Sequence, residues 1–88
     1  MNKITYNKFK KLLLDNFSDM RVLIQLRGTL DTKIFLDKAN ININQNKLVM
    51  SNDNKDVSIE LMNIKKIIMN QKYRIELLYE EFTIILEL

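Results

Sequence analysis

The stretch YRIELLYEEFTIILEL (residues 73–88) decides the fold, because it describes a β-hairpin with one favoured register. If Tyr79 and Phe82 face each other across a tight turn, the apolar residues of the two arms meet on one face. Arg74 then lies opposite Glu87 on the other face. A slip of one residue would turn the whole apolar set outward, so the register is strongly specified. The carboxyl end is therefore predicted to be antiparallel β-structure.

Upstream of this hairpin, apolar residues recur at every second position, which is the period of a half-buried strand. The expected strands cover residues 21–27, 33–38, 41–43, 48–50 and 57–61. Gly28, the only glycine, is expected in a turn at positive φ, where glycine costs least. Asparagine-rich stretches at 44–46 and 52–54 predict two hairpin turns, since Asn tolerates the left-handed region. The stretch 61–70 also has helical spacing, but its β-branched residues favour a brief turn running into a strand.

The amino-terminal segment 4–18 is predicted to be an amphipathic helix. Its apolar face consists of Tyr6, Phe9, Leu12, Leu13 and Phe17. Its opposite face carries three lysines, with Lys3 just before them, together with Leu14, which is the one apolar residue on the lysine side. We expect the first face to pack against the strands and the second to face water.

One domain is predicted for residues 1–88, because a chain of this length holds a single modest core. The expected fold is α+β, with an N-terminal helix capping a small, strongly bent antiparallel β-sheet or barrel of five to seven strands. The helix-first order of elements resembles that of Sm-like barrels. The strand rhythm of residues 41–86 loosely resembles pleckstrin-homology-type sheets. Both resemblances rest on rhythm alone, so the sequence assigns no family.

The composition argues against catalysis. The chain contains no Cys and no His, which removes thiol nucleophiles, imidazole bases and the usual zinc ligands. One glycine cannot form a phosphate-binding loop, and the carboxylates are dispersed. No apolar run approaches the ~18 residues of a membrane-spanning helix. We therefore expect a non-enzymatic, cytoplasmic protein without a signal peptide, membrane span, cofactor or metal.

Basic residues concentrate in the first half of the chain, although the net charge is only +3. The candidates for contacts with nucleic-acid phosphates are Lys3, Lys8, Lys10, Lys11, Arg21 and Arg27. Tyr6, Phe35 and Tyr73 could stack on bases. The alternative is that the lysines form an ordinary solvated helix face and the aromatic residues belong to the core.

Residues 39–50, ANININQNKLVM, place an asparagine at every second position. Asn40, Asn42 and Asn44 would share one face of a strand, with Ile41 and Ile43 on the other. Such a row could recognise base edges or a partner's backbone. We favour the simpler interpretation, in which the row is the solvent face of an edge strand near a turn.

Three apolar residues are predicted to lie among charges: Leu14 on the helix, and Leu78 and Ile85 on the Arg74 face of the hairpin. Adjacent apolar residues on a sheet need a cover, which would be either the N-terminal helix or another protein. Edge pairing through 82–88 would also permit a homodimer.

The leading hypothesis is a small binding protein that acts by protein–protein contact, as an adaptor or inhibitor. One version is a phage or mobile-element inhibitor of a host defence nuclease, similar in kind to anti-CRISPR proteins. That version follows from size and composition alone. The alternative is a nucleic-acid-binding small barrel of the Sm-like kind that uses the lysine-rich helix face.

Overall fold

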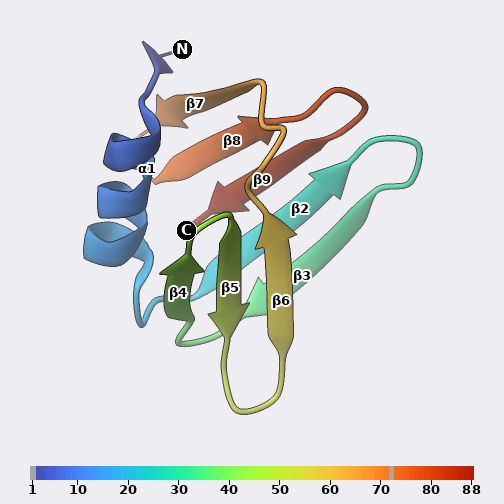
Figure 1. Cartoon of the computed structure of the whole chain (residues 1–88). Coiled ribbons are helices and arrows are strands. Elements are labelled where there is room, and N and C mark those ends of the chain that lie inside the picture. The colour runs from blue at the N-terminus through green and yellow to red at the C-terminus, as the bar shows by residue number, and fades with distance from the viewer. Residues whose placement is uncertain (1, 72) are drawn as a thin grey trace.

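The computed structural model describes residues 2–71 and 73–88 and shows an α+β protein with one N-terminal helical segment (Figure 1). That segment consists of α1 (Tyr6–Leu12) and the π-helical turn η1 (Leu13–Phe17). The strands are β1 (Asn2–Lys3), β2 (Val22–Arg27), β3 (Thr32–Leu36), β4 (Asn40–Asn44), β5 (Lys47–Ser51), β6 (Asp56–Glu60), β7 (Lys66–Gln71), β8 (Arg74–Leu78) and β9 (Thr83–Glu87). Every predicted strand is present. The stretch 61–70 is, as predicted, a turn that runs into a strand, β7. The structure has more strands than the five to seven expected, and the short β1 was not predicted.

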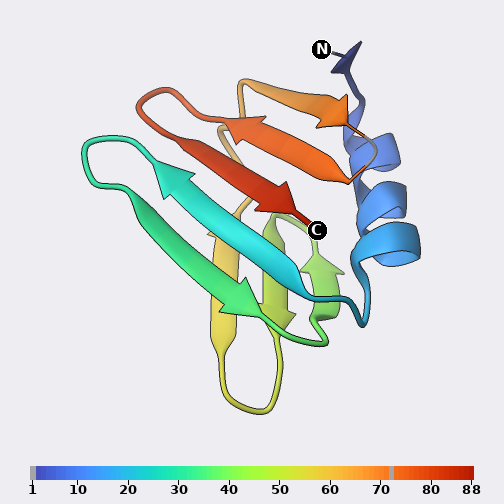
Figure 2. The ribbon, with the colours of Figure 1, turned by 180° about the vertical axis from the view of Figure 1, so that it is seen from behind.

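The strands form two antiparallel sheets. The larger has the order β1-β7-β8-β9-β2-β3, and the smaller has the order β4-β5-β6. The helix and the smaller sheet lie on one face of the larger sheet, and the view from behind shows the opposite face without an element in front of it (Figures 1 and 2). The described strands do not close into a barrel, so the barrel that the sequence left open is not confirmed.

The C-terminal hairpin has the predicted register, with Arg74 opposite Glu87 and Leu77 opposite Ile84. However, β9 pairs with β2 as well as with β8 and therefore has no free edge. The prediction of a homodimer through this strand is wrong, because both rows of its backbone hydrogen bonds are used within the chain.

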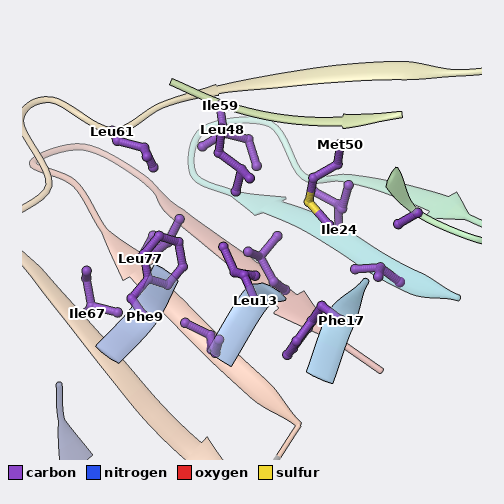
Figure 3. Packing of buried hydrophobic residues seen from close by; sticks show 14 of the residues in the cluster. Phe9, Leu13, Phe17, Ile24, Leu48, Met50, Ile59, Leu61, Ile67 and Leu77 are labelled. Carbon is purple, nitrogen blue, oxygen red and sulfur yellow. The ribbon is translucent and has the colours of Figure 1, made fainter. Parts of the chain in front are cut away.

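The core lies between the larger sheet and the two elements that cover it. Phe9, Leu13 and Phe17 are fully buried on one side of the helical segment, and Phe9 lies beside Ile67 and Leu77 of the larger sheet (Figure 3). The smaller sheet adds Leu48, Met50 and Ile59 to the same cluster. The predicted apolar helix face is thus confirmed at its three innermost positions.

The helix is shorter and less regular than predicted. The Thr5 side chain caps it by accepting a hydrogen bond from the Lys8 backbone N–H, at 3.2 Å. At the other end, the Ser18 N–H donates to the Leu13 carbonyl at 3.2 Å, which is π-helical geometry. In an α-helix of 3.6 residues per turn, each side chain is rotated about the helix axis relative to the one four residues before it. The wider π-helical turn limits this rotation and keeps Phe17 on the buried face.

Two turns have backbone conformations that differ from those expected. Gly28 lies between β2 and β3, but it does not adopt a positive φ. A Cβ at Gly28 would lie 3.0 Å from the Cβ of Phe82, so close approach is what requires glycine there. In the β4–β5 turn, Gln45 rather than a neighbouring Asn has a positive φ of 50°.

The asparagine row is on the solvent side of an edge strand, as the simpler interpretation predicted. β4 pairs only with β5, and Asn40, Asn42 and Asn44 are exposed, whereas Ile41 and Ile43 are half-buried. The Asn52 turn is also confirmed: its Oδ1 accepts from the backbone N–H groups of Asn54 and Lys55, both at 2.8 Å.

Candidate protein-binding surface

The three apolar candidates do not form one surface. Leu14 is 50% exposed and lies on the helix, whereas Leu78 is half-buried on the uncovered face of the larger sheet. Ile85 lies on that same face but is only 2% exposed. It sits between Gln25 and Glu76 on the adjacent strands, so neighbouring side chains bury it. The expectation that the helix covers this face is wrong, since the helix packs on the opposite one.

Three charged side chains on the uncovered sheet face, those of Arg74, Glu76 and Glu87, lie close to one another. Arg74 lies 3.9 Å from a Glu76 oxygen and 3.6 Å from a Glu87 oxygen. Its Nε is buried without a hydrogen bond among the described residues. The arginine therefore links two carboxylates on neighbouring strands.

The basic candidates fall into separate groups. Lys3, Lys8 and Lys11 are exposed on the N-terminal segment, and the Lys10 ammonium lies 5.3 Å from the centre of the Tyr6 ring. Tyr6 itself is partly exposed, and its hydroxyl donates to the Gln45 carbonyl at 2.9 Å.

The two arginines lie at opposite ends of β2. Arg21 precedes the strand, pairs with Asp37 at 3.3 Å and covers the exposed Phe35 ring at 4.8 Å. Arg27 ends the strand and donates to Gln25 at 3.3 Å. Tyr73 is exposed in the turn between β7 and β8. The structure thus groups the lysines and leaves the arginines apart from them.

The β2–β3 and β8–β9 turns lie side by side at the end of the sheet away from the helix (Figures 1 and 2). Large exposed apolar side chains lie on these turns and near them. We call this region the apolar end and define it by Leu26, Leu30, Met62 and Phe82, which are 37%, 78%, 53% and 39% exposed. Two open hollows, of about 420 and 350 Å³, meet there, and Phe82 lines both.

Local packing fixes the position of Phe82. Its ring stacks on that of Tyr79, with centroids 4.5 Å apart and planes 15° apart. The Tyr79 hydroxyl donates to the Glu60 carbonyl, which ties the β8–β9 turn to the end of β6. On the other side, the Gly28 backbone contacts Phe82, and the Gly28 N–H donates to Asp31 at 3.3 Å.

The environment of Tyr79 keeps its hydroxyl protonated. Burial and, to a smaller extent, the nearby Glu60 carboxylate together raise its pKa from 10.0 to about 12. A neutral tyrosine is a hydrogen-bond donor, so the link to β6 is retained across the whole neutral range.

Carboxylates surround the apolar end. Glu60, Glu80 and Glu81 line the hollows together with one ammonium, that of Lys65. Among the described residues, none of these three carboxylates forms an ion pair. The end is therefore apolar at its centre and acidic at its rim.

The sequence analysis did not find this region. Leu30 and Met62 are isolated apolar residues in predicted turns, and such residues are common on protein surfaces. The sequence feature that could have revealed this region is its two turns. Leu30 lies two residues after the only glycine, and Phe82 follows two glutamates. Only the β2–β9 pairing, which the sequence did not predict, brings those turns together.

Comparison with known proteins finds no match among protein families, curated proteins or solved structures. Within residues 2–71 and 73–88, no group of three or more acidic side chains lies close enough to hold a metal ion. Neither helical segment in those residues has the length and apolar character needed to cross a membrane.

Proposed function

We propose that this chain is a non-catalytic binding protein that acts by protein–protein contact at the apolar end. The observation that carries the proposal is the 78% exposure of Leu30 in a hollow that it lines together with Phe82. Single exposed leucines are ordinary, but a cluster of large apolar side chains around two hollows is typical of interaction sites. Fully burying one leucine contributes about 1.5–3 kcal/mol, so a few such side chains can support a specific complex.

The rigidity of the end adds to this support. Phe82 is held by its stack on Tyr79 and by the Gly28 backbone. An aromatic side chain that is already ordered loses little conformational entropy on binding, which favours affinity. Aromatic residues of this kind are enriched among the residues that dominate binding energies.

Affinity purification with two matched variants tests the proposal. Leu30→Ser removes the most exposed side chain of the apolar end, and Leu14→Ser removes a comparably exposed one from the helix. We expect a protein that co-purifies with the wild type from its source cells to be lost with Leu30→Ser and retained with Leu14→Ser. Identical co-purifying proteins in both variants would contradict the proposal.

A second candidate is nucleic-acid binding by the N-terminal lysines. It is favoured by the exposure of Lys3, Lys8 and Lys11, none of which forms an ion pair among the described residues. Fluorescence anisotropy with labelled DNA and RNA across salt concentrations tests it. Binding that weakens linearly with log salt and is lost in Lys10→Glu/Lys11→Glu would support this function over the first.

A finer version of the protein-binding proposal is inhibition of a host defence nuclease by a phage or mobile-element protein. It rests on the small size of the chain and on its lack of Cys and His. Cleavage assays with candidate nucleases test it: inhibition that disappears with Leu30→Ser but persists with Leu14→Ser would support it.

A further inference from the structure

The apolar end has the opposite sign of charge to the chain as a whole. The chain carries +3, yet three carboxylates and a single ammonium line the two hollows. Glu80 and Glu81 project from the turn between β8 and β9, directly before Phe82. The acidic rim and the apolar centre are thus parts of one surface.

Other carboxylates of the larger sheet have partners within the chain. Glu76 and Glu87 share Arg74, and Asp37 pairs with Arg21. The three glutamates of the apolar end have no such cation among the described residues. Their charges are therefore free to attract a cation from outside the chain.

We infer that the partner bound at the apolar end presents a basic protein segment, in which an apolar side chain is flanked by Lys or Arg. This inference rests on the proposed function and specifies the chemistry of its partner. The apolar side chain would enter the hollows beside Phe82 and Leu30, and the flanking cations would meet Glu60, Glu80 and Glu81. Nucleic acid is disfavoured at this end, because its phosphates would face the same carboxylates.

The two kinds of contact contribute differently. Burial of apolar surface supplies most of the affinity. Exposed rim charges mainly select the partner and accelerate its association, and salt screens them. A basic segment should therefore bind faster than a neutral one with the same apolar residues, and the advantage should shrink as salt rises.

Three short fluorescent peptides provide the test. They share the same Leu and Phe positions, and their flanking positions are all Lys, all Gln or all Glu. Anisotropy titrations at low salt are expected to rank the affinities as Lys, then Gln, then Glu. We expect about tenfold between the Lys and Glu peptides, falling toward equality near 1 M salt, where the Debye length is only about 3 Å.

Variants of the protein test whether the apolar end causes this ranking of peptide affinities. Glu80→Gln/Glu81→Gln should remove most of the difference between the peptides, whereas Asp15→Asn/Asp53→Asn, two exposed carboxylates elsewhere, should leave it intact. Leu30→Ser should weaken binding of all three peptides by about tenfold. Because these positions are exposed, circular dichroism should show an unchanged fold.

The outcomes separate the inference from the function on which it rests. Equal affinity for the Lys and Gln peptides, with sensitivity to Leu30→Ser, would overturn the inference and leave the proposed function standing. Binding that ignores Leu30→Ser would overturn both. Sedimentation of the protein alone provides a further check, because self-association that Leu30→Ser abolishes would identify a second copy of the chain as the occupant.

Discussion

The free edge of β3 and the apolar end are two places where the larger sheet can meet another chain, and they differ in how they are covered. Along the edge, the Lys55 ammonium donates to the Phe35 carbonyl at 2.7 Å, and the Asn52 amide donates to the Asp37 carbonyl at 2.8 Å. At the apolar end, Leu30 has no comparable cover. Side chains thus cover two carbonyls at the C-terminal end of the edge, whereas the apolar end is open.

The difference has a physical reason. An uncovered strand edge pairs with almost any extended chain, because it offers only backbone hydrogen bonds, and proteins shield such edges against aggregation. Apolar side chains around a shaped hollow are more selective, since a partner must match both the shape and the charge. The side-chain contacts therefore disfavour strand addition at the C-terminal end of β3, and the proposed recognition uses the apolar end instead.

Among changes outside the core, the largest effect is expected from Asn52→Ala, which removes the cover from one end of the β3 edge. Asn52 makes three hydrogen bonds, two to the backbone of its own turn and one to Asp37. At about 1 kcal/mol or less for each exposed bond, their loss should lower the free energy of unfolding by about 2 kcal/mol. Urea unfolding measures this loss, with Asn42→Ala on the exposed face of β4 as the control. Equal losses in the two variants would show that Asn52 has no special role.

A smaller loss in the free energy of unfolding, of about 1 kcal/mol, is expected from Gly28→Ala at the apolar end. The added Cβ would lie 3.0 Å from that of Phe82, so the β2–β3 turn must shift away. Chemical denaturation gives the loss, and amide NMR shifts around Phe82 report the movement. Thr29→Ala is the matched control in the same turn. An unperturbed Phe82 environment would show that the two turns are not packed against each other.

The sequence predicted where the strands lie more accurately than it predicted which strands pair with one another. The alternating apolar residues located the strands, and the C-terminal hairpin had the predicted register, because local periodicity records which side chains face the core. The pairing of β9 with β2 joins segments far apart in the chain, and no local pattern encodes it. Ile85 was therefore expected to need the helix or another protein as its cover, although Gln25 on β2 helps to bury it.

The candidate site was missed for the same reason. Leu30 and Phe82 lie in turns more than fifty residues apart, and each is unremarkable alone. Their proximity depends on the β2–β9 pairing and on a glycine whose role is close approach to Phe82. Sequence reasoning assigned that glycine to a positive φ instead, because close packing between turns leaves no periodic signal.

The Tyr79 anchor of the apolar end should depend on pH. Its pKa is raised from 10.0 to about 12 in the folded protein. Below pH 10, Tyr79 is neutral in both the folded and the unfolded protein, so the full free energy of unfolding is present. Between pH 10 and 12, Tyr79 ionises first in the unfolded chain, and the free energy of unfolding falls. Tyr79→Phe should lower the free energy of unfolding by about 1 kcal/mol at pH 8, through loss of the bond to Glu60. Urea titrations should show that the difference in the free energy of unfolding between variant and wild type narrows as the pH rises toward 12. A gap that stays constant with pH would mean that Tyr79 ionises alike in both states.

The smallest effect on stability is expected from Leu30→Ser, and it tests whether the apolar end is available to a partner. Leu30 is 78% exposed, so its replacement should change the free energy of unfolding by less than about 0.5 kcal/mol. Leu36→Ser, at a fully buried position on the adjacent strand, should instead cost several kcal/mol, because it removes core packing and buries a hydroxyl. Thermal unfolding of both variants gives the contrast. A loss above about 1 kcal/mol for Leu30→Ser would mean that this side chain already packs within the fold in solution, and the apolar end would then be covered just as the β3 edge is.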